Sequence, residues 1–281
     1  MTTRLAAGVV ALLLGAACGK SEAPVDGGHD AGGPLDAGVT PVCLEDRLDA
    51  GADDAGWDGG LDFSCRGQPT ARGGQAELVI GGKTTKAGLN RALLPGVRLE
   101  LLSRSGAVLA TATSAEDGGY ELRFDAGCEP LDGEVRATVD DVRDAGFFPS
   151  YAVPVAPWRY DRGGLELSLF DASTRGLVAA VASVTLQPST AALALTVEDC
   201  AGHPVPGATL AINLDGGVVR YVGASGLPTM QLASTGATGE AVLFNLAGDS
   251  VEVTATLGGE VVSRRVVPLH VDAITGTTLA P

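Results

Sequence analysis

The sequence predicts an all-β protein built from two β-sandwiches in tandem. Two observations lead to this fold class. From about residue 75 onward, apolar residues alternate with polar ones at the period-two spacing of strands that bury one face. Turns rich in glycine and aspartate separate these runs at the short intervals typical of a sandwich. The residues before position 65 show neither feature, so we expect the folded body to begin there.

The chain of 281 residues opens with an export signal over residues 1–17. Arg4 supplies a positive charge, and an apolar run of nine residues follows, too short for a bilayer span of about 20. Small residues then precede Cys18. The stretch Leu14 to Cys18 resembles the lipobox of bacterial lipoproteins, although Gly15 stands where leucine is usual. The resemblance implies that residues 1–17 are removed and that Cys18 carries fatty acids.

Residue 19 is glycine and not aspartate. By resemblance to Gram-negative sorting rules, this implies a protein anchored in the bacterial outer membrane, facing the periplasm or the cell surface. The alternative is a secretory leader cut elsewhere, which would leave Cys18 as an ordinary thiol. Both interpretations export the protein.

Residues 18–64 form a segment of different composition. Positions 19–64 hold 11 acidic residues against two basic ones, and Asp-Ala-Gly occurs four times. Without apolar periodicity the segment cannot bury enough surface to offset the entropy of ordering, so we expect a disordered acidic tether. Calcium binding by its aspartates is a weaker alternative, because the order of a calcium loop is absent. The whole chain has a net charge of −15, which argues against a nucleic-acid partner.

Four cysteines remain after Cys18, and export permits disulfides. They are Cys43, Cys65, Cys128 and Cys200, and they allow three pairings. We favour Cys43 with Cys65 and Cys128 with Cys200, since the first two flank the acidic segment and the last two each follow a strand-like run. Their spacing does not fit a zinc site, so no metal is expected.

Two series of alternating runs predict the two sandwiches. The first module, residues 65–172, contains apolar alternation at 97–101, 120–124, 135–139 and 165–169. The second module, residues 189–281, contains it at 193–197, 210–214 and 251–257. Each run has the period of a half-buried strand.

The two modules also share local sequence. Leu94-Pro95-Gly96-Val97 opens a strand in the first, and Val205-Pro206-Gly207-Ala208 opens one in the second. Downstream, residues 113–120 correspond to residues 234–241, which indicates an internal repeat. In the first copy this opener is followed by a turn and strand of the pattern Thr-x-x-x-Asp-Gly-x-Tyr-x-Leu, from Thr113 to Leu122. This combination resembles the carboxypeptidase regulatory-like family. In the second copy Thr238 replaces the aspartate and Ala241 the tyrosine. The resemblance implies transthyretin-like Greek-key sandwiches, and no catalytic residue comes with it.

Between the modules, Leu177, Val178, Val181 and Val184 recur at helical spacing. Ser173 is a candidate N-cap and a proline at 188 would stop the run, so we expect one connecting helix over residues 173–188. The alternative is another strand, because valine is common in strands.

Aromatic residues concentrate in one stretch, residues 147–160, between prolines. Prolines confine it to a sheet edge or an ordered loop. Beside Arg159 and Arg162, the rings of Trp158 or Tyr160 would stack on a sugar or bind an acidic partner. The competing interpretation is that these rings fill one end of the sandwich.

Catalytic motifs are incomplete. The stretch 81–84 lacks the first glycine of a phosphate-binding loop, and 223–226 falls one residue short of a serine-hydrolase elbow. The three histidines, at 29, 203 and 270, are not at metal-ligand spacing. We therefore expect no catalytic site, no metal and no cofactor.

The sequence favours a lipid-anchored, non-enzymatic envelope protein that presents two modules for structural or binding work. Its partners would be the membrane, through the lipid, and a protein or a carbohydrate. The alternatives are an exported hydrolase with an unrecognised site, and an accessory subunit of an envelope enzyme or transport complex. An enzyme should show titratable groups of perturbed pKa converging in a cleft.

Overall fold

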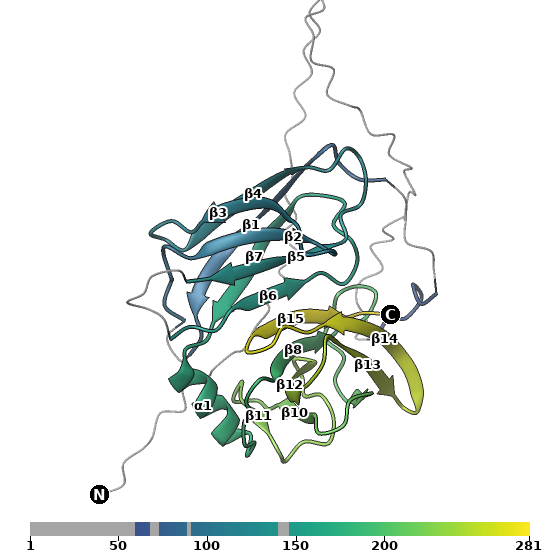
Figure 1. The fold of residues 1–281 in the computed structure, drawn as a ribbon. Coiled ribbons are helices and arrows are strands. Elements are labelled where there is room, and N and C mark those ends of the chain that lie inside the picture. Colours follow the sequence, from purple (N-terminus) through teal and green to yellow (C-terminus); the bar gives the residue numbers. More distant parts are fainter. Residues whose placement is uncertain (1–59, 68–72, 89–90, 140–145) are drawn as a thin grey trace, which may run out of the picture.

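The computed structural model describes residues 60–67, 73–88, 91–139 and 146–281. The predicted leader, Cys18, Cys43 and the tether up to residue 59 lie outside these residues. The described part confirms the all-β prediction with one short helix (Figure 1). The elements are β1 Glu77–Lys86, β2 Arg98–Ser103, β3 Val108–Thr113, β4 Gly119–Asp125, β5 Gly133–Thr138, β6 Ser150–Val153, β7 Arg162–Leu169, α1 Ala172–Val181, β8 Ala191–Val197, β9 Thr209–Ile212, β10 Val218–Val222, β11 Pro228–Thr229, β12 Glu240–Leu246, β13 Ser250–Leu257, β14 Glu260–Pro268 and β15 Ile274–Leu279.

One continuous sheet of nine strands runs through both halves of the molecule. Its order is β11-β10-β12-β8-β15-β6-β5-β2-β3, and two three-stranded sheets, β4-β1-β7 and β14-β13-β9, cover parts of it. The halves join where the last strand of the chain, β15, pairs in parallel with β6 of the first half. Figure 1 shows β15 lying between β6 and β8. Neither half therefore has a free edge at this seam.

The two sandwiches bury opposite faces of the shared sheet. Residues paired across neighbouring strands point to the same face, and successive residues alternate. Ala152 of β6, which belongs to the first core, pairs with Gly276 of β15. Leu279 of β15 belongs to the second core and is three residues further along, so it points to the other face. The covering sheets consequently lie on opposite sides.

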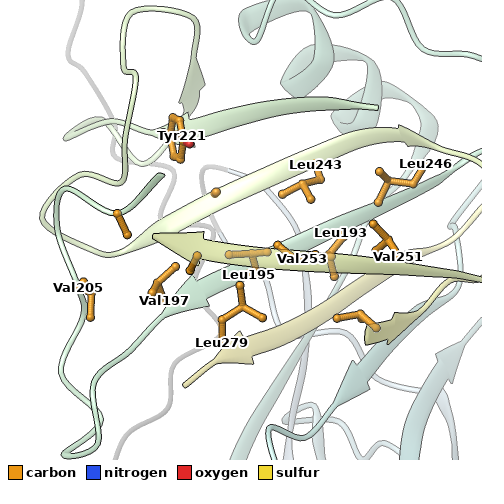
Figure 2. Packing of buried hydrophobic residues seen from close by; sticks show 14 of the residues in the cluster. Leu193, Leu195, Val197, Val205, Tyr221, Leu243, Leu246, Val251, Val253 and Leu279 are labelled. Atoms are coloured by element: carbon orange, nitrogen blue, oxygen red, sulfur yellow. The ribbon is translucent and has the colours of Figure 1, made fainter. Parts of the chain in front are cut away.

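Each sandwich has its own aliphatic core, from the alternating runs that the sequence predicted. The first is lined by buried residues of β1, β2, β4, β5 and β7, and includes Leu78, Leu99 and Leu122. The second lies between β8, β12 and β15 on one side and β13 and β14 on the other. Figure 2 shows leucine and valine side chains of this second core filling the space between the strands.

The internal repeat is confirmed in the hydrogen bonds of the two Pro-Gly turns. In the first copy the Ser114 hydroxyl donates to Leu94 O and accepts from Val97 N, both at 2.9 Å. In the second, the Thr235 hydroxyl donates to Val205 O at 2.7 Å and accepts from Ala208 N at 2.8 Å. A buried hydroxyl thus closes the same turn in both copies.

The predicted helix between the modules is confirmed, but its start and end differ from expectation. The N-cap is Asp171, whose carboxylate accepts from Thr174 N at 2.7 Å, and not Ser173. The helix ends at Val181, well before residue 188. Val178 is buried against the shared sheet, whereas Leu177 is 59% exposed. Asp171 is the stronger cap because it is ionised and also pairs with a lysine.

The favoured disulfide pairing is wrong. Cys65 is bonded to Cys200, with an S–S distance of 2.06 Å, and Cys128 is also in the disulfide form. The prediction paired Cys65 with the cysteine nearest to it in sequence. The chain, however, passes along the second sandwich before it enters the first, which brings Cys65 to Cys200. Residues 60–64, assigned to the disordered tether, are part of this contact: Leu61 and Phe63 pack against the second core.

Candidate ligand-binding site at the junction of the sandwiches

Three parallel strands bring two distant loops together. β6, β15 and β8 run in the same direction, so their carboxyl ends lie at the same edge of the shared sheet. The loop after β6, residues 154–161, therefore meets the turn after β8, residues 198–203. On the face of the first core, the covering layer ends at β7 while the shared sheet continues to β15 and β8. This step in the layers leaves a cavity.

The cavity has a volume of about 580 Å³, within the usual range for small-ligand sites of roughly 300–1,000 Å³. Residues from both halves line it. They are Ala152 to Arg162, Gly164 to Glu166, Glu198, Ala201 to His203 and Gly276 to Thr278. All four residues singled out from the sequence, Trp158, Arg159, Tyr160 and Arg162, are among them.

The two aromatic residues of this group occupy different environments. Trp158 is 8% exposed, belongs to the first core, and its backbone N–H donates to Leu131 O at 2.9 Å. Tyr160 is 54% exposed at the cavity wall. Trp158 therefore packs in the first core and leaves little of its surface to the cavity. Tyr160 is the ring that is free to stack.

The remaining aromatics of the stretch 147–160 serve the fold. Phe148 lies under the guanidinium of Arg175, 4.3 Å from the ring centroid. Tyr151 stacks on His270, with ring centroids 3.6 Å apart. These two rings are therefore engaged in contacts within the fold and are not available to stack on a ligand.

Two arginines line the cavity beside three carboxylates. Within the described residues, neither Arg159 nor Arg162 has a carboxylate within 4.0 Å, the distance of an ion pair. In Arg159 the Nε and Nη2 atoms are shielded from solvent and have no hydrogen-bond partner in the described part of the chain. Such unpaired buried donors are rare and costly.

Three carboxylates also line the cavity, and two of them are already engaged. Asp161 accepts from Val79 N at 2.8 Å, and Glu166 pairs with Arg91 at 2.6 Å. Burial raises the pKa of Glu198, an effect that the positive charge of Arg162 partly offsets. Glu198 is thus the carboxyl group available to a ligand, and its environment favours the protonated form.

An acid–histidine pair holds the turn after β8. Burial acts to raise the pKa of Asp199, but backbone N–H groups of Asp62, His203 and Ala201 donate to its carboxylate and lower the pKa overall. The His203 Nδ1 lies 3.4 Å from Asp199 Oδ2, and the ring borders the cavity. The carboxylate thereby fixes the loop that carries the histidine.

The sequence did not identify Glu198 or His203 as site residues. Both come from the second copy, whereas the other site residues come from the first. No local motif marks them, because the seam between β6 and β15 brings them to the cavity. The residues at 81–84, rejected as a phosphate-binding loop, lie inside β1. There Gly82 allows the close approach of β7, since a Cβ atom would lie 1.8 Å from Leu165 O.

Within residues 60–67, 73–88, 91–139 and 146–281, no group of three or more histidine, cysteine or acidic residues is arranged to hold a metal ion. Across the same residues, no helix has the length and apolar character needed to cross a membrane.

No family model and no curated protein matches the chain. Among solved structures, the Bacillus anthracis TIE protein is similar at a TM-score of 0.26 and 11% identity, over 73% of this chain and 33% of that one. Shaft pilin spaA from Lactobacillus rhamnosus GG is similar at 0.21 and 12%, over 73% and 98%. Full-length major pilin RrgB from Streptococcus pneumoniae gives 0.21 and 10%, over 74% and 49%. This chain spans about a third of the TIE protein. TM-scores this low support no conclusion about function.

Proposed function

We propose that this protein is an exported, lipid-anchored, non-enzymatic binding protein of the bacterial outer membrane, and that its ligand site is the cavity between the two sandwiches. The observation that carries the proposal is the cavity of about 580 Å³ at a seam between modules, lined by an exposed ring and unpaired charges. Sites of this kind favour such boundaries. The export signal and Cys18 supply the location.

A tryptophan reporter tests the binding site. The chain has two tryptophans, so Trp57→Phe leaves Trp158, at the cavity wall, as the single emitter. We expect its fluorescence to respond to a ligand found in a panel of envelope saccharides and short peptides. The panel uses the full chain carrying Cys18→Ser, which has no lipid. A panel without any response would contradict the binding function.

Occlusion separates the cavity from other surfaces. Ala201 is exposed at the cavity mouth, so Ala201→Trp should block entry without disturbing a core. Its matched control is Ala115→Trp, in the exposed turn before β4 and outside the cavity lining. Because the added indole obscures the reporter, calorimetry measures this pair. Binding that survives Ala201→Trp would place the site elsewhere.

The anchor has its own test. Two or three acyl chains hold a protein on a membrane far more firmly than one. Cys18→Ser should therefore move the protein from the membrane to the soluble fraction. A mutant that stays with the membrane in high salt would overturn the lipoprotein assignment.

An exported hydrolase is the second candidate, and Glu198 is the observation that favours it. A carboxyl group with raised pKa in a cavity is a candidate general acid. The usual glycosidase pair needs a second free carboxylate, and the other two carboxylates that line the cavity are engaged. Hydrolysis of chromogenic glycosides that Glu198→Gln abolishes would establish the enzyme and displace the binding function.

A further inference from the structure

We infer that the junction cavity binds a saccharide that carries a carboxylate, such as a hexuronate unit of an acidic polysaccharide. This inference rests on the proposed function and names its ligand class. Three features support it: unpaired positive charge at the cavity wall, an exposed aromatic ring, and a carboxyl group suited to sugar hydroxyls.

The first feature is the positive charge of the two arginines at the cavity. Among the carboxylates around the cavity, Glu166 forms an ion pair with Arg91 and Asp161 accepts a hydrogen bond from Val79 N. Arg159 and Arg162 have no such ion pair, and two guanidinium nitrogens of Arg159 are both shielded and unsatisfied. Arg159 as a whole is half-buried and lines the cavity, and a planar carboxylate matches the geometry of a guanidinium.

The net charge of the whole protein bears on how the cavity would bind an anion. The protein as a whole has a net charge of −15, so its general field repels anions. Arg159 and Arg162 carry the opposite charge at the cavity, where Arg162 also acts on the nearby Glu198. An anionic ligand would therefore be held locally and at short range, where the low dielectric of the cavity strengthens the interaction.

The ring and the acid favour a sugar over a simple anion. Tyr160 presents a half-exposed ring beside the arginines, a surface on which the apolar face of a pyranose packs. Glu198, whose pKa burial raises, offers both a donor and acceptors when protonated, and sugar hydroxyls pair with both. The two groups come from opposite sides of the seam, one from the loop after β6 and one from the turn after β8.

The experiment compares the binding of an acidic disaccharide with that of its uncharged counterpart. Digalacturonate, galactobiose of the same linkage, inorganic phosphate and an acidic tripeptide are titrated into the full Cys18→Ser chain by calorimetry. We expect digalacturonate to bind at least about tenfold more tightly than galactobiose, since a charge-assisted hydrogen bond is worth about one such factor or more. Affinity for digalacturonate should also fall as salt rises.

Variants assign the effect to the cavity. Arg159→Gln should weaken digalacturonate binding about tenfold or more, whereas Arg159→Lys keeps the charge and should retain most of it. Arg104→Gln is the matched control, since Arg104 is a surface residue paired with Asp132 away from the cavity. Circular dichroism and melting temperature show that each variant is folded.

The outcomes are distinct. Equal binding of galactobiose, or tighter binding of phosphate or of the peptide, overturns the carboxylated saccharide, while the proposed binding function stands if Ala201→Trp blocks that ligand. Digalacturonate binding that Arg159→Gln leaves unchanged also overturns the inference. If only these probes fail to bind, the proposed ligand class is wrong. If the whole panel of saccharides and peptides fails to bind, the proposed binding function is wrong as well.

Discussion

The two copies of the repeat are nearly identical at their Pro-Gly turns and unlike each other at the seam where they meet. In each turn a buried hydroxyl, Ser114 or Thr235, bonds to the backbone on both sides of the Pro-Gly pair. At the seam, by contrast, β6 of the first copy pairs with β15 of the second, and the two cores face opposite ways. The fold of each copy is thus local, whereas the cavity arises from their arrangement.

The seam is also chemically different from the cores. The sandwich interiors are aliphatic, while polar groups hold the seam. Arg265 of β14 donates to Thr277 Oγ1 at 2.7 Å and to the carbonyl of Pro154 in the first half. Burial lowers the pKa of Arg265, yet its hydrogen bonds satisfy the charge. A polar seam can leave room for a ligand, since it does not depend on close apolar packing.

The largest loss of stability should come from truncating a core side chain of the first copy next to the cavity. Trp158→Ala removes a side chain that belongs to the core, so we expect a loss of about 3–5 kcal/mol in the free energy of unfolding. Tyr160→Ala, at an exposed ring, should cost under about 1 kcal/mol. Urea unfolding measures both. A small loss for Trp158→Ala would show that this ring does not pack as core.

The next effect is specific to the second copy. The Cys65–Cys200 bond closes a chain separation of 135 residues and ties the entering chain to the second sandwich. Replacing both cysteines by serine should destabilise the protein by roughly 2–4 kcal/mol. Chemical unfolding under non-reducing conditions measures the difference from the parent. A mass map that joined Cys65 to any other cysteine would contradict the pairing.

The two turn hydroxyls provide a matched pair. Ser114→Ala leaves the Val97 N–H without its partner, while Leu94 O still accepts from the Thr84 hydroxyl. Thr235→Val removes the hydroxyl that bonds both Val205 O and Ala208 N. Each change should cost about 1–3 kcal/mol. Thr235→Ser keeps the hydroxyl and serves as the control. The loss should be larger for Thr235→Val, because it leaves two backbone groups without the hydroxyl and Ser114→Ala leaves one. If only one of the two variants were less stable than the parent, the turns would share a geometry but not a contribution to stability.

Sequence patterns predicted what depends on neighbouring residues. Alternation along the chain located the cores, and the repeated Pro-Gly turns located the matching strand openers, because both follow from local side-chain direction and turn geometry. Composition also singled out Trp158, Arg159, Tyr160 and Arg162, and all four line the cavity.

The rest depends on contacts between distant segments. Glu198 and His203 reach the cavity only because β15 inserts between β8 and β6, a pairing that no periodicity encodes. The disulfide error has the same origin, since residues 60–67 pack on the second sandwich, and not on the first that follows them in sequence. The position of one repeat relative to the other is therefore what the sequence left open.

The smallest predicted effect concerns the helix that links the copies, where two candidate caps lie two residues apart. Asp171 accepts from Thr174 N and pairs with Lys86 at 2.7 Å, while Ser173 only donates to Asp171. Asp171→Ala should cost about 1 kcal/mol, and Ser173→Ala a few tenths. The ion pair with Lys86 and the backbone N–H of Thr174 hold the pKa of Asp171 below its usual value.

The pH dependence follows from that direction. A carboxyl group whose pKa is lower in the folded state stabilises the protein above its unfolded pKa of about 3.9, and the stabilisation is lost as pH falls further through the folded value. The difference between parent and Asp171→Ala should thus be full at pH 7 and shrink below about pH 4. Equal unfolding curves for the parent and Asp171→Ala at pH 7, with a loss for Ser173→Ala, would make Ser173 the cap after all.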